Sequence, residues 1–230
     1  MNTQAMNKRI RLIMELRGQG ITDADVLGAI EKVPRDEFVP EYSQDQAWEN
    51  IALPIGLGQT ISQPLVVALM SQSLQLSDRD KVLEIGTGCG YQAAVLSHLC
   101  RRVYTIERHK ALLRESEARL ERLRLRNITA IAADGMKGWP TINGIDQAPF
   151  DNIIVTAAAR TKPPQALLDQ LKIGGRMILP IGEPGEQMLK LYKRESEEAY
   201  AVKDVMAVRF VPLLPDVTDD KNDMSAVAHS

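Results

Sequence analysis

Residues 81–91, KVLEIGTGCGY, decide the fold, because a short apolar run ends in glycines at every second position, Gly86, Gly88 and Gly90. An unbroken run of valine, leucine and isoleucine is typical of a strand that is buried on both faces. Glycines directly after such a strand allow a tight turn and a close approach of the backbone to a ligand. The segment YQAAVLSHL (91–99) is a predicted helix, so the stretch predicts a strand, a glycine loop and a helix.

Strands and helices are predicted to alternate along the rest of the chain. The predicted strands are RVYTIE (102–107), ITAIAAD (128–134), FDNIIVTAA (150–158) and GRMILPIG (175–182), and the predicted helices lie at 109–126 and 163–171. Such alternation indicates a doubly wound α/β fold with a mostly parallel sheet. Two later runs, 188–194 and 202–213, are predicted to form a C-terminal antiparallel strand pair.

The chain before the glycine loop is predicted to start with two helices, forming an N-terminal helical appendage. Ile10, Ile13, Met14 and Leu16 recur at helical spacing, and Thr22 is the expected N-cap of the second helix. Residues 41–63 show no clean period, and PIGLGQT (54–60) within them is expected to be an ordered loop, after which Pro64 opens a buried helix. We therefore expect residues 1–63 to carry helices and an active-site loop, 64–214 to form the core, and 215–230 to be a disordered acidic tail.

Composition excludes several classes of protein. The 230 residues carry a formal net charge of −2, which disfavours a dedicated nucleic-acid binder. No apolar run is long enough to cross a membrane, and the first residues lack the continuous apolar segment of a secretory signal. Two cysteines, Cys89 and Cys100, cannot form a disulfide framework. We expect a cytoplasmic protein, with either Met1 or Met6 as its first residue.

The glycine loop and two acidic residues indicate a nucleoside ligand. The dinucleotide-binding pattern G-x-G-x-x-G would need glycine at position 91, where Tyr91 stands. Glu107 and Asp134 end the next two predicted strands, where one carboxylate can accept from ribose hydroxyls and the other from an adenine amino group. Either acid alone is equally compatible with a solvated strand end. The loop and both acids, in this order, favour a nucleoside cofactor over a structural turn.

This pattern resembles the class I methyltransferases, whose methyl donor is S-adenosylmethionine (SAM). The resemblance implies a Rossmann-like fold in which the glycine loop holds the amino-acid part of SAM, Glu107 the ribose and Asp134 the adenine. Glu84 would assist the methionine amino group. The cofactor-binding set expected from the resemblance is Ile61, Gln63, Glu84, Gly86, Thr87, Gly88, Gly90, Glu107, Asp134 and Gly135.

Further blocks of sequence resemble the protein-L-isoaspartate O-methyltransferases. They are ALPIGLGQTISQP (52–64), VPR (33–35) with FVP (38–40), EIGTG followed by GY (84–91), and RFVPL (209–213). The resemblance implies methylation of the α-carboxylate of L-isoaspartyl residues, which initiates repair of damaged proteins. It implies isoaspartyl proteins and peptides as partners and SAM as the methyl donor. We expect no metal, no nucleic-acid or membrane partner, and a monomer, because a large acceptor needs open access.

Ser62 is the expected catalytic residue and Thr60 a second positioning hydroxyl. The acceptor carboxylate is already ionised at neutral pH, so the reaction needs alignment and exclusion of water rather than a general base. Alternate residues of an extended segment face one way, so both hydroxyls can point at the carboxylate. Ser62 could instead simply cap the helix that Pro64 opens.

Three other functions compete with this interpretation. A SAM methyltransferase acting on a small molecule or RNA would lack the QTISQP block (59–64). An NAD(P) oxidoreductase is disfavoured by Tyr91, and a module that binds SAM without turnover is disfavoured by the intact Ser62, Glu107 and Asp134.

Overall fold

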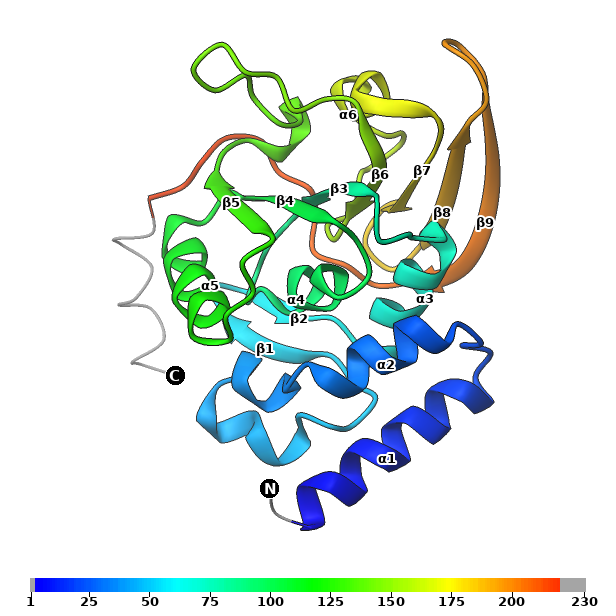
Figure 1. Ribbon diagram of the computed structural model, residues 1–230. Helices are drawn as coiled ribbons and strands as arrows, with labels where there is room; N and C mark the ends of the chain where they lie inside the picture. The colour runs from blue at the N-terminus through cyan, green and yellow to red at the C-terminus, as the bar shows by residue number, and fades with distance from the viewer. Residues whose placement is uncertain (1–2, 220–230) are drawn as a thin grey trace.

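A seven-stranded sheet forms the centre of the molecule in the computed structural model, which describes residues 3–219 (Figure 1). Its strand order is β5-β4-β3-β6-β7-β8-β9. The strands are β3 (Lys81–Ile85), β4 (Arg102–Glu107), β5 (Ile128–Ala132), β6 (Phe150–Val155), β7 (Leu171–Ile181), β8 (Gln187–Arg194) and β9 (Tyr200–Val208). The first five are parallel, while β8 and β9 run antiparallel to their neighbours. The predicted doubly wound, mostly parallel sheet with an antiparallel C-terminal pair is confirmed.

The order of the strands reverses at β3. The chain moves from β3 to β4 and β5 on one side, then returns to place β6 on the other side of β3. Ligands of open α/β sheets bind at the carboxyl ends of the strands beside such a reversal. The glycine loop directly follows β3, so it lies at this position.

Helices cover both faces of the sheet, and alternate strand residues point into separate apolar cores. Val82 and Ile154 pack against α3 (Pro64–Leu74) and α4 (Tyr91–Ser97). Other residues of these two helices share a further apolar core with α5 (Lys110–Arg122). Leu83 and Ile153 pack on the opposite face, near α6 (Gln165–Gln170) and the 3-10 turn η3 (Gly135–Lys137). The mostly apolar runs in the strands therefore correspond to burial on both sides.

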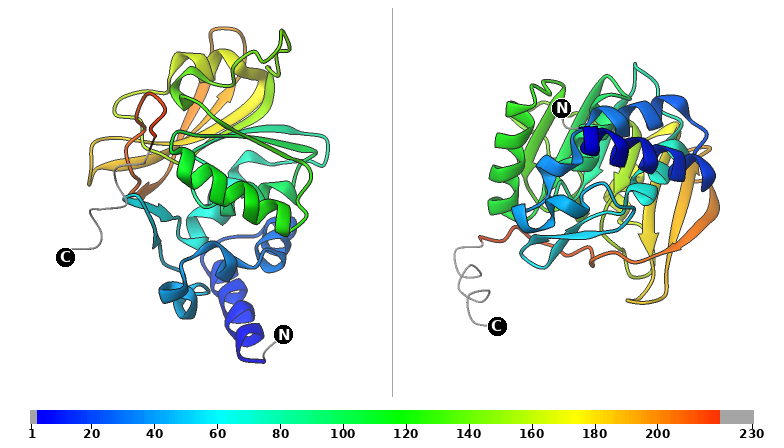
Figure 2. Two further views of the ribbon diagram at one scale, coloured as in Figure 1. Left: turned by 90° about the vertical axis from the view of Figure 1, so that its left-hand side faces the viewer. Right: turned by 90° about the horizontal axis from the view of Figure 1, so that it is seen from below.

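The N-terminal helices form an outer layer over α3 and α4 (Figures 1 and 2). They are α1 (Thr3–Gly18) and α2 (Ala24–Lys32), followed by the 3-10 turns η1 (Arg35–Phe38) and η2 (Glu41–Gln46). The prediction of Thr22 as the N-cap of the second helix is wrong. Asp23 caps α2, because its carboxylate accepts from the backbone N–H groups of Asp25 and Val26.

A β-hairpin occupies part of the segment that was expected to be a loop. Strands β1 (Leu53–Gly56) and β2 (Gln59–Ile61) pair antiparallel, with Leu53 opposite Ile61. Leu57 turns the chain with φ of 50° between two glycines that also have positive φ. The hairpin lies close to the carboxyl edge of the large sheet and leads directly into α3 at Pro64, as expected for proline in a first helical turn.

Residues 209–219, here called the C-terminal strap, cross the carboxyl edge of the sheet. The N–H of Ala158 donates to Val211 O and the N–H of Leu213 donates to Ala158 O, both at 2.8 Å. Further along, the N–H of Thr218 donates to Arg108 O at 2.9 Å. Residues 215–219, which were assigned to the acidic tail, are therefore held against the core. The rest of that predicted tail, 220–230, lies outside the described residues.

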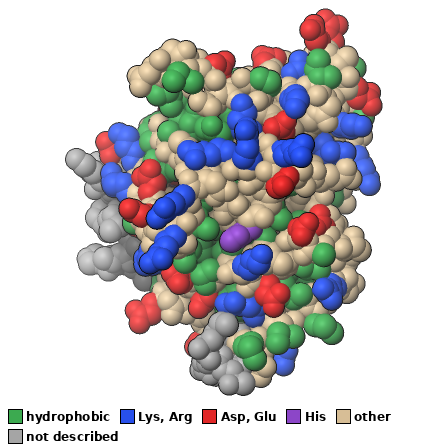
Figure 3. Space-filling view, viewed as in Figure 1, with side chains coloured by type: hydrophobic (Ala, Val, Ile, Leu, Met, Phe, Trp, Pro, Cys, Tyr) green, Lys and Arg blue, Asp and Glu red, His purple; other side chains and the backbone are tan. Residues whose placement is uncertain are grey.

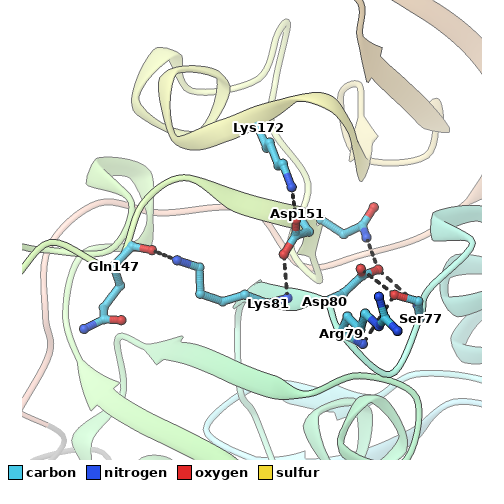
Figure 4. A network of polar contacts seen from close by, with 8 residues as sticks. Ser77, Arg79, Asp80, Lys81, Gln147, Asp151 and Lys172 are labelled. Atoms are coloured by element: carbon cyan, nitrogen blue, oxygen red, sulfur yellow. Dashed lines mark hydrogen bonds and ion pairs between the residues drawn. The ribbon is translucent and has the colours of Figure 1, made fainter.

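A network of polar contacts joins β3 and β6 at the opposite, amino edge of the sheet (Figure 4). The Asp151 carboxylate accepts from the backbone N–H of Lys81 and from Lys172 Nζ, each at 2.8 Å. Asp80 accepts from Asn152 at 3.0 Å and from the Ser77 hydroxyl at 2.7 Å. Burial alone would raise the pKa of Asp151, but these hydrogen bonds and the two lysine charges outweigh it and hold the pKa below its usual value.

Replacing Asp151 with asparagine is expected to lower the free energy of unfolding by about 1–2 kcal/mol at pH 7. Asparagine keeps one oxygen that can accept from the Lys81 N–H, so what is lost is the charge on that hydrogen bond and the ion pair with Lys172, which solvent screens because Lys172 is 57% exposed. Since the folded-state pKa lies below the unfolded value, the stabilisation is present above that unfolded value and disappears as pH falls through the folded pKa. Denaturant titrations at pH 7 and near pH 3 test this, and an equal penalty at both pH values contradicts it.

Candidate active site

A cavity of about 210 Å³ lies at the carboxyl edge of the sheet, where the strand order reverses. The cavity is lined by segments from the hairpin, the glycine loop, the end of β4, η3 after β5, the end of β6 and the C-terminal strap. Of the residues expected at the site, it is lined by Thr60, Ile61, Ser62, Gly86, Thr87, Gly88, Glu107 and Gly135. The structure therefore brings together eight residues that are up to 75 positions apart in the sequence.

The glycine loop is held by contacts that leave no room for a larger residue at its first position. Gly86 has φ of +95°, and a Cβ atom there would lie 2.3 Å from Thr156 Oγ1. The Thr156 hydroxyl donates to Gly86 O at 2.7 Å, which ties the ends of β3 and β6 together. The Gly86 N–H donates to Ile106 O at 2.8 Å. The backbone of the loop is therefore fixed on both sides before any ligand is present.

Glu107 at the end of β4 joins two walls of the cavity. Its Oε2 accepts from the N–H of Gly88 at 2.8 Å, and its Oε1 accepts from the N–H of His109 at 2.9 Å. The residue is 5% exposed and lines the cavity. A carboxylate has about four acceptor positions, so two remain for hydroxyl groups of a ligand.

Glu84 does not line the cavity but lies beneath the glycine loop, fully buried. Its Oε2 accepts from the Thr105 hydroxyl at 2.5 Å, and the Thr105 hydroxyl lies 2.7 Å from that of Thr87, a residue that lines the cavity. Burial raises the pKa of Glu84 to about 8, the Thr105 hydrogen bond opposing this shift and the neighbouring Glu107 adding to it. A cation bound at Thr87 would favour the ionised form of Glu84.

The side chain of Asp134 is also outside the cavity. It caps η3 by accepting from the N–H of Met136 at 2.9 Å, and it forms an ion pair with Lys137 at 3.1 Å. Its neighbour Gly135 does line the cavity, packed so closely that a Cβ would lie 2.4 Å from Ile85 Cγ2. Asp134 therefore shapes the turn that presents Gly135.

Two more of the expected residues lie to one side of this cavity. Gly90 is the N-cap of α4, where a Cβ would meet Ser116 Cβ at 3.3 Å, so it allows α4 to pack on α5. The Gln63 side chain donates to Asn50 O at 2.8 Å. The N-cap residue of α3 is Gln63, directly before Pro64, although its side chain makes no capping hydrogen bond. Because Gln63 occupies the cap position, Ser62 does not cap that helix.

Ser62 and Thr60 lie on a wall that the first cavity shares with a second one. The second cavity, about 430 Å³, lies between the hairpin, the start of α3 and the strap with the end of β9. The residues common to both cavities are Thr60, Ser62, Thr156 and Val211. Neither the Ser62 nor the Thr60 hydroxyl forms a hydrogen bond within residues 3–219. Both hydroxyls are therefore available to a ligand at the junction.

Sequence reasoning missed several residues of the site. Thr156, which lines both cavities and ties the glycine loop, follows an apolar strand and has no distinguishing neighbour in sequence. His109 lines the first cavity because it follows Glu107 at a strand end, a position that could have been noted. Burial raises the pKa of the Cys89 thiol in the same cavity, so this cysteine stays protonated at neutral pH. Among the described residues, no cluster of His, Cys, Asp and Glu could hold a metal ion.

The fold and this site define the class of protein. A seven-stranded sheet that reverses at β3, a glycine loop at the reversal, and a strand-end glutamate that braces the loop are the features of a class I, SAM-dependent methyltransferase. The family model for protein-L-isoaspartate(D-aspartate) O-methyltransferase matches residues 7–218. The chain belongs to this family and is an enzyme that transfers methyl from SAM to protein L-isoaspartate.

Proteins of the same family are similar to this chain over nearly its whole length. The protein-L-isoaspartate O-methyltransferase of Rhodospirillum rubrum is 58% identical over 90% of this chain and 93% of its own, and that of Rhodospirillum centenum is 55% identical over 93% and 94%. A solved protein-L-isoaspartate O-methyltransferase superposes with a TM-score of 0.81 at 29% identity, covering 91% of this chain and 67% of the other. A Plasmodium falciparum structure shares the fold, with a TM-score of 0.75 at 24% identity, covering 89% of this chain and 97% of its own.

Proposed function

We propose that Ser62 is the catalytic residue and that Thr60 positions the acceptor beside it. One observation carries the proposal: both hydroxyls lie on the wall shared by the two cavities, without partners among the described residues. The first cavity would hold SAM over the glycine loop, and the second would admit the isoaspartyl segment of a damaged protein. The methyl group and the carboxylate would then meet at Ser62.

The residues of the first cavity fit SAM. The two remaining acceptor positions of Glu107 suit the ribose hydroxyls, and the closely packed backbone at Gly135 suits a flat adenine ring. Ile61, which is buried and lines the cavity, offers an apolar contact. The hydroxyl chain from Thr87 through Thr105 to Glu84 would respond to the methionine amino group. SAM, when bound, supplies an electrophilic methyl on a sulfonium cation.

Alignment and desolvation would supply the catalysis. A carboxyl of this kind ionises near pH 3.3–3.9, roughly as model carboxyls do, so the acceptor oxygen is nucleophilic without a general base. The Ser62 hydroxyl would donate to one carboxylate oxygen and so aim the other at the methyl group. The first turn of α3 begins at Pro64, and its partial positive charge would also favour an anion held at Ser62. Opposite charges are lost in the transition state, so excluding water favours reaction.

The segments would have distinct tasks. We propose that residues 1–63 form the acceptor side and residues 64–214 the SAM-binding core. Gln63 lines the second cavity, beside the expected acceptor, while Gly90 and Asp134 act by shaping the loops around SAM. Each assignment predicts that substitution of the residue alters affinity for only one of the two ligands.

We further infer a metal-independent monomer of the cytoplasm that acts on proteins and not on nucleic acids or membranes. Figure 3 shows a band of lysine and arginine side chains with acidic side chains among them. The formal net charge of the whole chain is −2, and this balance does not favour binding of a polyanion such as a nucleic acid. Cys89 and Cys100 are both free and buried, as suits a reducing compartment. Among residues 3–219, no helix combines the length and apolar character needed to cross a bilayer. Activity in EDTA and light scattering of the eluted protein test the metal and the monomer.

The acceptor is tested with two peptides that differ only in L-isoaspartate or L-aspartate at one position. Methyl transfer from labelled SAM is expected on the isoaspartyl peptide alone, as base-labile label, because the α-carboxylate is free only in that linkage. Equal labelling of both peptides would indicate a broader carboxyl methyltransferase. Retained SAM binding without label on either peptide would contradict the proposed acceptor and favour a small molecule or RNA.

A further inference from the structure

Arg35 is the largest fully buried side chain of the described residues, and it is a cation. It opens η1, in the VPR block (33–35) that precedes the hairpin. Arg35 forms no salt bridge with any residue from 3 to 219. Burial lowers the pKa of its guanidinium, with Tyr91 and Cys89 partly offsetting the shift. A buried charge without a carboxylate partner is costly, so its contacts require an explanation.

The guanidinium closes the base of the hairpin. Its Nη2 donates to Ser62 O at 2.8 Å and to Ile51 O at 3.2 Å. These two carbonyls flank the hairpin, one just before β1 and the other just after β2. This nitrogen atom therefore joins the two ends of the hairpin, alongside the pairing of Leu53 with Ile61 and the Gln63 side chain that donates to Asn50 O. The end that it holds most closely is the backbone of Ser62 itself.

The same guanidinium contacts the SAM side of the site. It lies 4.7 Å from the centre of the Tyr91 ring, a cation–π contact. Tyr91 is the first residue of α4, directly after the glycine loop, and it lines the first cavity. Phe38, at the end of η1, packs edge-on against the same ring at 5.4 Å. Arg35 therefore joins the base of the hairpin to the residue that follows the glycine loop, through buried contacts on both sides.

We propose that Arg35 is a positioning residue, which fixes the distance between the Ser62 hydroxyl and the SAM methyl group by tying the hairpin base to Tyr91. The proposal rests on the catalytic role proposed for Ser62. A planar guanidinium suits this task, since it can donate in its plane and stack on a ring at the same time. A displacement of about 1 Å at a reacting pair can reduce the rate roughly 100-fold.

Two substitutions test the proposal, each measured as activity per folded molecule. Arg35→Gln is expected to lower kcat for the isoaspartyl peptide about 100-fold, with SAM affinity changed less than about threefold. Arg35→Lys can still donate to both carbonyls but loses the planar stacking, so about a tenfold loss is expected. If the glutamine variant does not fold, the lysine variant carries the test.

Arg9→Gln provides the matched control. Arg9 also lies over an aromatic ring of the N-terminal segment, 4.4 Å from the centre of Trp48. Burial raises the pKa of Tyr91 and the Arg9 charge opposes this rise, but among the described residues Arg35 and not Arg9 donates to Ile51 O and Ser62 O. Arg9→Gln is expected to leave kcat unchanged. Amide exchange of residues 53–61 should accelerate about tenfold in Arg35→Gln and not in Arg9→Gln, because only the former releases the hairpin.

Several outcomes would overturn the proposal. Wild-type kcat in folded Arg35→Lys, a lysine variant no better than the glutamine variant, or unchanged exchange of the hairpin would each contradict it. A loss of SAM affinity equal to the loss of kcat would indicate a merely structural role. Failure of the Ser62 proposal is distinguishable, since Ser62→Ala would then be active while Arg35→Gln still loosened the hairpin.

Discussion

Ser62→Ala is expected to lower kcat for an isoaspartyl peptide by about 100-fold or more, with SAM affinity within about threefold of wild type. Loss of one preorganised hydrogen-bond donor in a water-excluded site typically costs a factor of this size. The Ser62 hydroxyl has no hydrogen bond to lose within residues 3–219, and the fold should therefore be unaffected. Single-turnover kinetics with labelled SAM, together with calorimetric measurement of SAM binding, would separate the chemical step from cofactor affinity.

Ser73→Ala is the matched control for this substitution. Ser73 lies on α3, close in sequence to Ser62, and its hydroxyl donates to Leu69 O within the helix at 2.7 Å. It should change kcat little. Thr60→Val is expected to have an intermediate effect, acting more on KM, because Thr60 is exposed on the acceptor wall. A Ser62→Ala enzyme that turned over like Ser73→Ala would remove Ser62 from the mechanism.

Glu107→Gln is expected to weaken SAM binding about 100-fold, although the two side chains have the same shape. The glutamine amide has only one acceptor oxygen, so either the N–H of Gly88 or that of His109 must face an NH2 group. An unpaired buried donor, and the loss of a charge-assisted bond, account for a change of this size. The proposed acceptor for a ribose hydroxyl is lost at the same time.

Equilibrium binding of SAM and of its demethylated product checks this expectation, with thermal unfolding as a measure of the fold. Glu37→Gln is a suitable control, because Glu37 forms a surface ion pair with Arg122 at 3.1 Å, away from the cavity. It should bind SAM normally. Binding by Glu107→Gln within threefold of wild type would show that the carboxylate neither braces the loop nor holds the cofactor.

Most of the sheet could be predicted from the sequence, because its strands are apolar runs separated by helices with clear periodicity. The hairpin could not, since β1 and β2 have only four and three residues and carry Pro54, Gly56 and Gly58 around the turn. Its strands pair with each other, and Leu53 and Ile61 pack into the apolar core that the helices form, so tertiary contacts decide their conformation. The cap of α2 was misplaced by one residue because Thr22 and Asp23 are both good capping residues.

The sequence predicts the positions of candidate-site residues better than the directions of their side chains, again because tertiary contacts decide the latter. Glu107 and Gly88 lie in the cavity as expected, because a strand end and a glycine loop have positions that follow from the fold. The side chains of Glu84 and Asp134 also lie at strand ends, but one points beneath the loop and the other caps its own turn. Sequence order places a residue at an edge of the sheet, whereas the direction of its side chain depends on packing.

The C-terminal strap has a consequence for biosynthesis. A nascent chain emerges from the ribosome with the N-terminal helices first, then the hairpin, the glycine loop and Glu107, and the sheet can begin to assemble on them. Residues Val211–Leu214, which line the cavity opposite the glycine loop, are made among the last of the described residues. A fragment ending before residue 209 would contain the glycine loop and Glu107, which we propose hold SAM, but not the strap residues that also line the cavity. Methyl transfer is therefore expected only after the chain has been translated through residue 214.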